Sequence, residues 1–117
     1  MAFKFEGLRT WQLSMDLAER VNEIADRFPK KELYNLSSQS RRAADSVSLN
    51  IAEGSTGLSD PEQIKFHGYA NRSALETVTC IIKAKRRKYI DESTFSELYI
   101  DYEKLSTMIQ AQIRALK

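Results

Sequence analysis

The sequence has few of the residues that interrupt or cross-link a chain. Its 117 residues include 4 glycines, 2 prolines and 1 cysteine. A lone Cys80 excludes an intramolecular disulfide and argues against a secreted, disulfide-stabilised scaffold. So few breakers, together with periodically spaced apolar residues, favour an all-α fold.

Long apolar runs and a strong excess of one charge are also missing. No run approaches the roughly 20 apolar residues that a membrane-spanning helix needs, and residues 1–6 lack the apolar core of a signal peptide. We therefore expect a cytoplasmic protein with no membrane partner. The formal net charge is +2, from 18 basic and 16 acidic residues. This is too small to indicate nucleic-acid binding by itself, so local clustering of cations must decide.

Four stretches have the apolar spacing of an α-helix, which predicts helices over residues 10–28, 36–54, 60–88 and 93–116. The expected N-caps are Thr10, then Ser37 or Ser38, then Asp60, with Pro61 at the first helical position. Short links between helices of this length favour an up-down-up-down four-helix bundle. We expect one domain, residues 1–117.

The first predicted helix is apolar over an arc of about 200°, whereas packing in a bundle needs little more than 100°. The surplus predicts a second contact, with another subunit or with a partner. In the third and fourth helices we expect the following residues to point inward: Ile64, Ala70, Ala74, Leu75, Val78, Ile81 and Ile82, then Phe95, Leu98, Tyr99, Tyr102, Leu105, Ile109, Ile113 and Leu116.

The second predicted helix has a face of small residues beside a polar stripe. The small face allows close approach of another helix and comprises Ser40, Ala43, Ala44, Val47, Ile51 and Gly54. The stripe comprises Gln39, Arg42, Ser46, Asn50 and Glu53. Arg42 is suited to bidentate binding of a phosphate or a carboxylate. Alternatively, Arg42, Asn50 and Glu53 form a polar network that fixes subunit register. We expect the stripe to face a neighbouring subunit.

Cations cluster on the third predicted helix. Lys65, Arg72 and Lys83 fall within about 20° of one another on a helical wheel, and Arg86 and Arg87 flank them. Tyr69 lies nearby, where it can stack on an exposed base. These residues are candidates for nucleic-acid binding, with Arg41 and Arg42 as a second group. The alternative is a solvated face whose cations favour the helix C-terminus, and Glu76 supports it by interrupting the stripe.

Catalytic and metal-binding patterns are not recognisable. His67 is the only histidine and is expected to be packed and hydrogen-bonded near Asn71. Cys80 has no positioned base and is expected to be inert. The Gly54–Gly57 segment is explained by helix termination. We therefore expect no enzyme activity, no cofactor and no metal.

The run Arg41–Ala44 followed by Asn50–Gly54 resembles the signature of the 23S rRNA intervening-sequence proteins, a bacterial four-helix bundle family. Further similarity lies at Trp11, Phe28-Pro29, Glu32–Leu36 and Ala70–Glu76, with departures at Ser40, Ser48 and Arg72. The resemblance implies a ring-shaped homo-oligomer, a homopentamer, that binds nucleic acid. A relative acts as an accessory subunit of a reverse transcriptase, which implies the alternative role of a protein-interaction scaffold. We expect non-catalytic binding of structured RNA.

Overall fold

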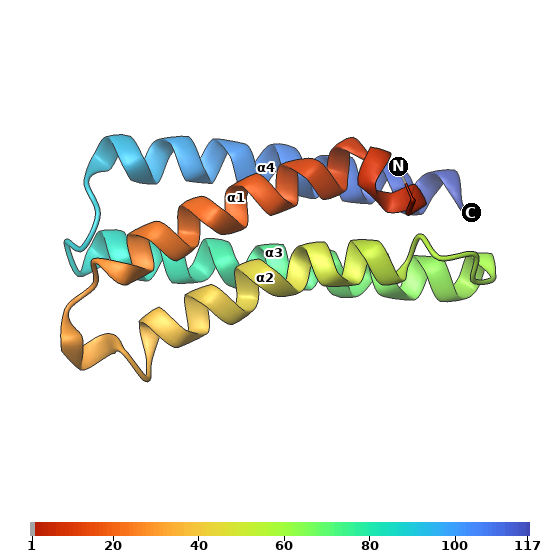
Figure 1. Cartoon of the computed structure of the whole chain (residues 1–117). Helices are drawn as coiled ribbons and strands as arrows, with labels where there is room; N and C mark the ends of the chain where they lie inside the picture. Colours follow the sequence, from red (N-terminus) through yellow and green to blue (C-terminus); the bar gives the residue numbers. More distant parts are fainter. Residues whose placement is uncertain (1) are drawn as a thin grey trace.

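A computed structural model describes residues 2–117 and confirms four α-helices. They are α1 (Arg9–Asp26), α2 (Leu36–Glu53), α3 (Asp60–Arg86) and α4 (Glu92–Ala115), with two short 3-10 helices, η1 (Lys4–Gly7) and η2 (Lys30–Glu32). Consecutive helices run antiparallel along a molecule 43 Å long (Figure 1), which is the predicted up-down-up-down order. No strand occurs within residues 2–117. None of the described helices is apolar enough over a sufficient length to cross a membrane.

Helices α2 and α3 form the most closely packed pair. Their facing side chains are small, as predicted, and Ala44, Ala70 and Ala74 are buried between the helices. At Gly54 the helices approach closely, since an added Cβ would lie 3.0 Å from Cε1 of His67. A side chain at Gly54 would therefore require the His67 ring to shift by a few tenths of an ångström.

Larger side chains from α1 and α4 complete the core. Leu17 and Val21 of α1, and Leu98 and Leu105 of α4, are fully buried, and each contributes about 1.5–3 kcal/mol through removal of apolar surface from water. On the surface between the two helices, Arg20 bonds to Glu97 and Asp101, at 3.3 and 2.8 Å. An exposed pair of this kind fixes geometry more than it adds stability.

The predicted helix starts were wrong by one to a few residues. Thr10 is buried inside α1 rather than at its cap, and α2 is preceded by Asn35 instead of opening at a serine. At α3 the cap is Ser59, whose Oγ accepts a hydrogen bond from the Glu62 amide at 3.4 Å. Asp60 therefore occupies the first helical position and Pro61 the second. Ser and Asp both accept this bond, so sequence alone does not distinguish adjacent candidates.

Two residues predicted to point inward are exposed. Leu75 on α3 is 55% exposed and Tyr99 on α4 is 42% exposed. The buried face of α3 passes through Ala70, Ala74 and Ile81, which leaves Leu75 outside it. The surplus apolar arc of α1 has an explanation within the chain. Phe5 of η1 covers Trp11, with ring centroids 5.1 Å apart, although Met15 stays exposed.

Candidate nucleic-acid interface

The outer face of α3 carries four cations, of which three are exposed and one, Lys83, is partly buried. Its inner face is formed by Ala70, Ala74 and Ile81, so the residues on the opposite side of the helix reach solvent. Within residues 2–117, none of these four cations forms a salt bridge. We call them the α3 basic face: Lys65, Arg72, Lys83 and Arg86.

The α3 basic face is long enough to contact several phosphates. At a rise of 1.5 Å per residue, Lys65 and Arg86 lie about 30 Å apart along the helix axis. A single DNA strand presents one phosphate for roughly every 3.4 Å of duplex axis. The longest gap, about 16 Å by the same rise, separates Arg72 from Lys83 and contains Glu76. The face therefore consists of two cationic halves with one acidic residue between them.

Tyr69 lies within the first half of this face. Its ring is partly exposed, with Lys65 Nζ 6.0 Å and Arg72 Cζ 5.8 Å from the ring centroid. Phe66 contacts the ring edge-on at 5.8 Å between centroids. Cation–π attraction at such distances is worth about 0.5–1 kcal/mol at an exposed site. The arrangement holds an aromatic surface between two cationic groups.

Two of the cations proposed from the sequence are occupied by carboxylates. Arg87 donates a hydrogen bond from its guanidinium to Glu32 at 3.1 Å. Arg41 forms an ion pair with Asp26 of α1. These contacts tie α3 and α2 to other parts of the chain, so both arginines have a structural role in the described molecule.

Arg42 extends the cationic surface onto α2. Its side chain is exposed and makes no salt bridge within residues 2–117. Burial raises the pKa of the Cys80 thiol, while the positive charges of Lys83 and Arg42 oppose that shift. Both cations therefore lie near enough to the Cys80 thiol to affect its pKa.

The family model for the 23S rRNA-intervening sequence protein matches residues 6–111, from η1 into α4. The chain belongs to the 23S rRNA-intervening sequence protein family. No curated protein matches the chain significantly.

In this member of the family, several of the residues that carry the resemblance hold α2 against α3. Ala43, Ala44 and Ile51 are buried, and Gly54 lies against the His67 ring. These positions are therefore part of the packed interior of the bundle, and Gly54 allows the close contact of α2 with α3.

The polar stripe on α2 is divided between packing and solvent. Ser73 donates a hydrogen bond to Ser46 Oγ at 2.9 Å, and Asn50 donates to Ser46 Oγ at 3.0 Å. Asn50 thus bonds to Ser46 instead of linking Arg42 and Glu53 within the chain. Glu53 is exposed and Gln39 is partly buried. A contact of this stripe with a second subunit stays a prediction.

Sequence reasoning missed a buried carboxylate, Glu32, near the C-terminal end of α3. Glu32 is 5% exposed and accepts hydrogen bonds from Tyr89 Oη at 2.7 Å and Asn35 Nδ2 at 3.1 Å, besides Arg87. The bond from Tyr89 is the main cause of a lowered pKa at Glu32. Only the chain fold brings these groups together, since Tyr89 lies 57 residues along the sequence.

The remaining reactive side chains are buried among the helices. His67 is buried as predicted, but its Nδ1 has no hydrogen-bond partner within the described residues. No hydrogen bond joins it to Asn71 within the described residues, and the Asn71 Oδ1 instead accepts a hydrogen bond from Ser106 at 2.6 Å. No group of three or more His, Cys, Asp or Glu side chains in residues 2–117 is arranged to hold a metal ion.

Proposed function

We propose that this protein binds nucleic acid, specifically structured RNA, through the α3 basic face, and that it does so without catalysis. The observation that supports this most directly is the set of four unpaired cations along one helix, with Tyr69 between two of them. Binding would rest on electrostatic contact with the phosphate backbone rather than on readout of bases. Such contact orients an RNA without discriminating its sequence.

We further propose that the protein acts in the cytoplasm as a ring-shaped homo-oligomer, a pentamer. Exposed apolar side chains that a subunit interface would cover are Leu49 on α2, Leu75 on α3 and Ile100 on α4. A ring would repeat the α3 basic face around its circumference. Repetition raises the effective concentration of cations for an RNA long enough to contact two subunits.

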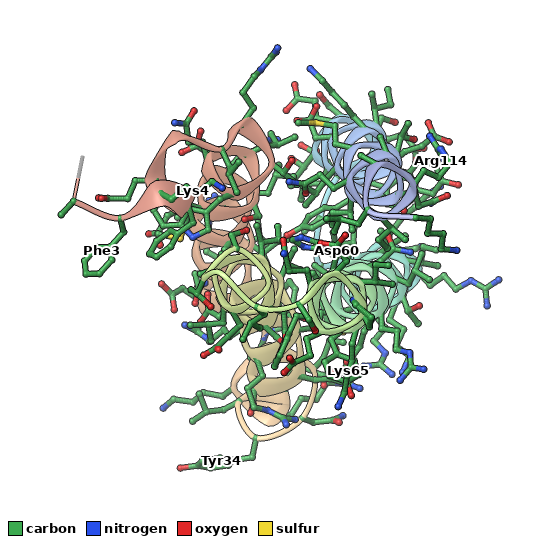
Figure 2. All side chains as sticks on the ribbon, turned by 90° about the vertical axis from the view of Figure 1, so that its right-hand side faces the viewer. Phe3, Lys4, Tyr34, Asp60, Lys65 and Arg114 are labelled. Carbon is green, nitrogen blue, oxygen red and sulfur yellow. The ribbon has the colours of Figure 1, made fainter. Side chains whose placement is uncertain are left out.

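A salt titration with two matched triple variants tests RNA binding. The first, Arg72→Glu/Lys83→Glu/Arg86→Glu, reverses three charges of the α3 basic face and leaves the paired Arg87 in place. The second, Arg9→Glu/Lys104→Glu/Arg114→Glu, makes the same change in net charge on exposed residues of α1 and α4. Figure 2 shows Arg114 well away from Lys65.

The first variant should bind labelled RNA at least about tenfold more weakly, and its dependence of log affinity on log salt should be shallower by about two to three units. The second variant should bind like the wild type. An equal loss of affinity in both variants would mean that net charge, not the α3 basic face, determines binding. Absence of RNA binding by the wild type at low salt would contradict the proposal. Circular dichroism and mass measurements confirm that fold and assembly are unchanged.

A protein-interaction scaffold is a second candidate function, favoured by a groove of about 260 Å³ between α3 and α4. Leu75 and Tyr99 line this groove, and both side chains are exposed to solvent rather than packed in the core. A single stoichiometric partner recovered after nuclease treatment, and lost with Leu75→Asp, would support this role. Recovery of the same partner by Leu75→Asp would exclude the groove.

A further inference from the structure

The segment that joins α1 to α2 presents an unusually exposed aromatic side chain. We call Lys30–Asn35 the connector tip. Tyr34 is 93% exposed, and its neighbour Leu33 is half-exposed. Figure 2 shows Tyr34 at the outer edge of the molecule, directed away from the helices. Both faces of its ring are therefore free.

The connector tip is ordered by a dense set of hydrogen bonds, so the exposure of Tyr34 is built into the fold. Backbone bonds close η2 from Leu33 N to Lys30 O at 3.1 Å and from Asn35 N to Glu32 O at 2.9 Å. The Glu32 carboxylate then fastens the tip to Arg87 beyond the end of α3. Because the backbone at Tyr34 is already fixed, only the rotation of its side chain is lost when a ligand stacks on the ring.

The charge of the connector tip is positive on its outward side. Lys30 and Lys31 are exposed and make no salt bridge within residues 2–117. The one acid of the tip, Glu32, is turned inward and compensated by Arg87. That ion pair joins the tip to the residue that follows Arg86, the last residue of the α3 basic face. Lys30 and Lys31 therefore add positive charge at the end of the bundle where α3 ends (Figure 1).

We propose that Tyr34 stacks on an unpaired nucleobase of an RNA whose backbone lies on the α3 basic face, an inference that rests on the proposed function. Stacking on an aromatic ring is available to every base, but a base within a duplex is already stacked on both sides. The tip would therefore distinguish bulges, loops and single strands from continuous duplex. Backbone contacts on α3 would supply affinity, and Tyr34 would supply preference for unpaired structure.

Two RNAs that differ by one nucleotide test the inference: a continuous duplex hairpin, and the same hairpin with one added, bulged 2-aminopurine. Tyr34→Ala should weaken binding of the bulged RNA about tenfold, with duplex affinity and salt dependence unchanged because no charge is removed. Quenching of 2-aminopurine fluorescence on binding should also be lost. Tyr34→Phe keeps a stacking ring and should behave like the wild type. Leu33→Ala removes neighbouring apolar surface without a ring and should have no effect.

The outcomes separate this inference from the proposed function. If Tyr34→Ala binds both RNAs like the wild type, or weakens both equally, the stacking role is overturned while the α3 basic face stands. If the wild type binds neither RNA at low salt, both ideas fail together. Binding to vesicles of anionic phospholipid that depends on Tyr34, with RNA binding unaffected, would overturn stacking in favour of a lipid surface.

Discussion

At the scale of single residues, Glu32 holds the two loops at one end of the bundle together. Glu32→Gln keeps the size and shape of the side chain but removes the negative charge to which Arg87 and Tyr89 donate hydrogen bonds. We expect the midpoint of thermal denaturation of Glu32→Gln at pH 7 to be lower than that of the wild type by about 5–10 °C. Glu103→Gln changes an exposed carboxylate on α4 and should leave the midpoint unchanged. Equal midpoints for Glu32→Gln and the wild type would mean that the carboxylate does not stabilise the loops.

His67 should make the stability of the protein pH-dependent below about pH 6.5. Burial lowers the pKa of His67 below its usual 6.5, so the folded chain keeps the ring neutral while the unfolded chain takes up a proton. Stability is therefore complete above pH 6.5 and falls below it, by up to about 1.4 kcal/mol per pH unit, until the folded pKa is reached. Urea denaturation from pH 5 to 8 measures this loss.

The comparison variant is His67→Gln, which removes the only histidine of the chain. Its stability should change little across the same range. Glu32 and Asp91, whose pKa values are lowered, affect stability in a more acidic range. Their stabilising contribution is lost only as the pH falls below about 4.5. Parallel curves for the two proteins between pH 5 and 6.5 would show that His67 does not cause the dependence.

At the scale of secondary-structure elements, the C-terminus of α3 carries a residue with an unfavourable backbone conformation. Lys88 has φ of 64°, and the amides of Lys88 and Tyr89 bond to the carbonyls of Lys85 and Ala84, both at 2.9 Å. Glycine is the usual residue at this position because it lacks a Cβ. Lys88→Gly should raise the free energy of unfolding by about 1 kcal/mol. Lys88→Ala removes the same charge but keeps the strain, so a gain in both variants would contradict this explanation.

The positions of the helices were largely predictable, because Pro29, the Gly54–Gly57 segment and Pro61 mark their boundaries. The outward direction of Lys65, Arg72 and Lys83 followed from helical periodicity alone. What could not be predicted depends on contacts between distant parts of the chain. The covering of Trp11 by Phe5 has no periodic signal in a four-residue element.

The same limit applies to the candidate site. Helical periodicity gives the direction of a cation but not its partner. Arg87 meets Glu32 across 55 residues, and Arg41 meets Asp26 on another helix. A wheel also leaves the rotation of a helix about its axis undetermined. That rotation decides that Leu75 is exposed while Cys80 is buried.

At the scale of the whole molecule, the outer face of α2 is where self-association can be tested without disturbing the α3 basic face. Leu49 is 65% exposed and lies on this face between Arg42 and Glu53. Leu49→Asp would place a charge where an apolar contact is expected, and Glu53→Ala would remove a polar contact of the predicted stripe. Both should lower the assembly mass measured by light scattering at low protein concentration. Leu33→Asp, on the connector tip, should not.

A variant that no longer assembles should separate two contributions to RNA affinity, the contact with one subunit and the simultaneous contact with neighbouring subunits. A monomeric variant keeps all four cations of the α3 basic face, so its affinity for an RNA that reaches only one subunit should equal that of the wild type. Affinity for a longer RNA should fall, because simultaneous contact with neighbouring subunits is lost. Leu49→Asp tested on a short and a long hairpin at one salt concentration measures both. An equal loss on the two RNAs would place the RNA contact on α2 itself, and an unchanged mass would remove the outer face of α2 as the interface.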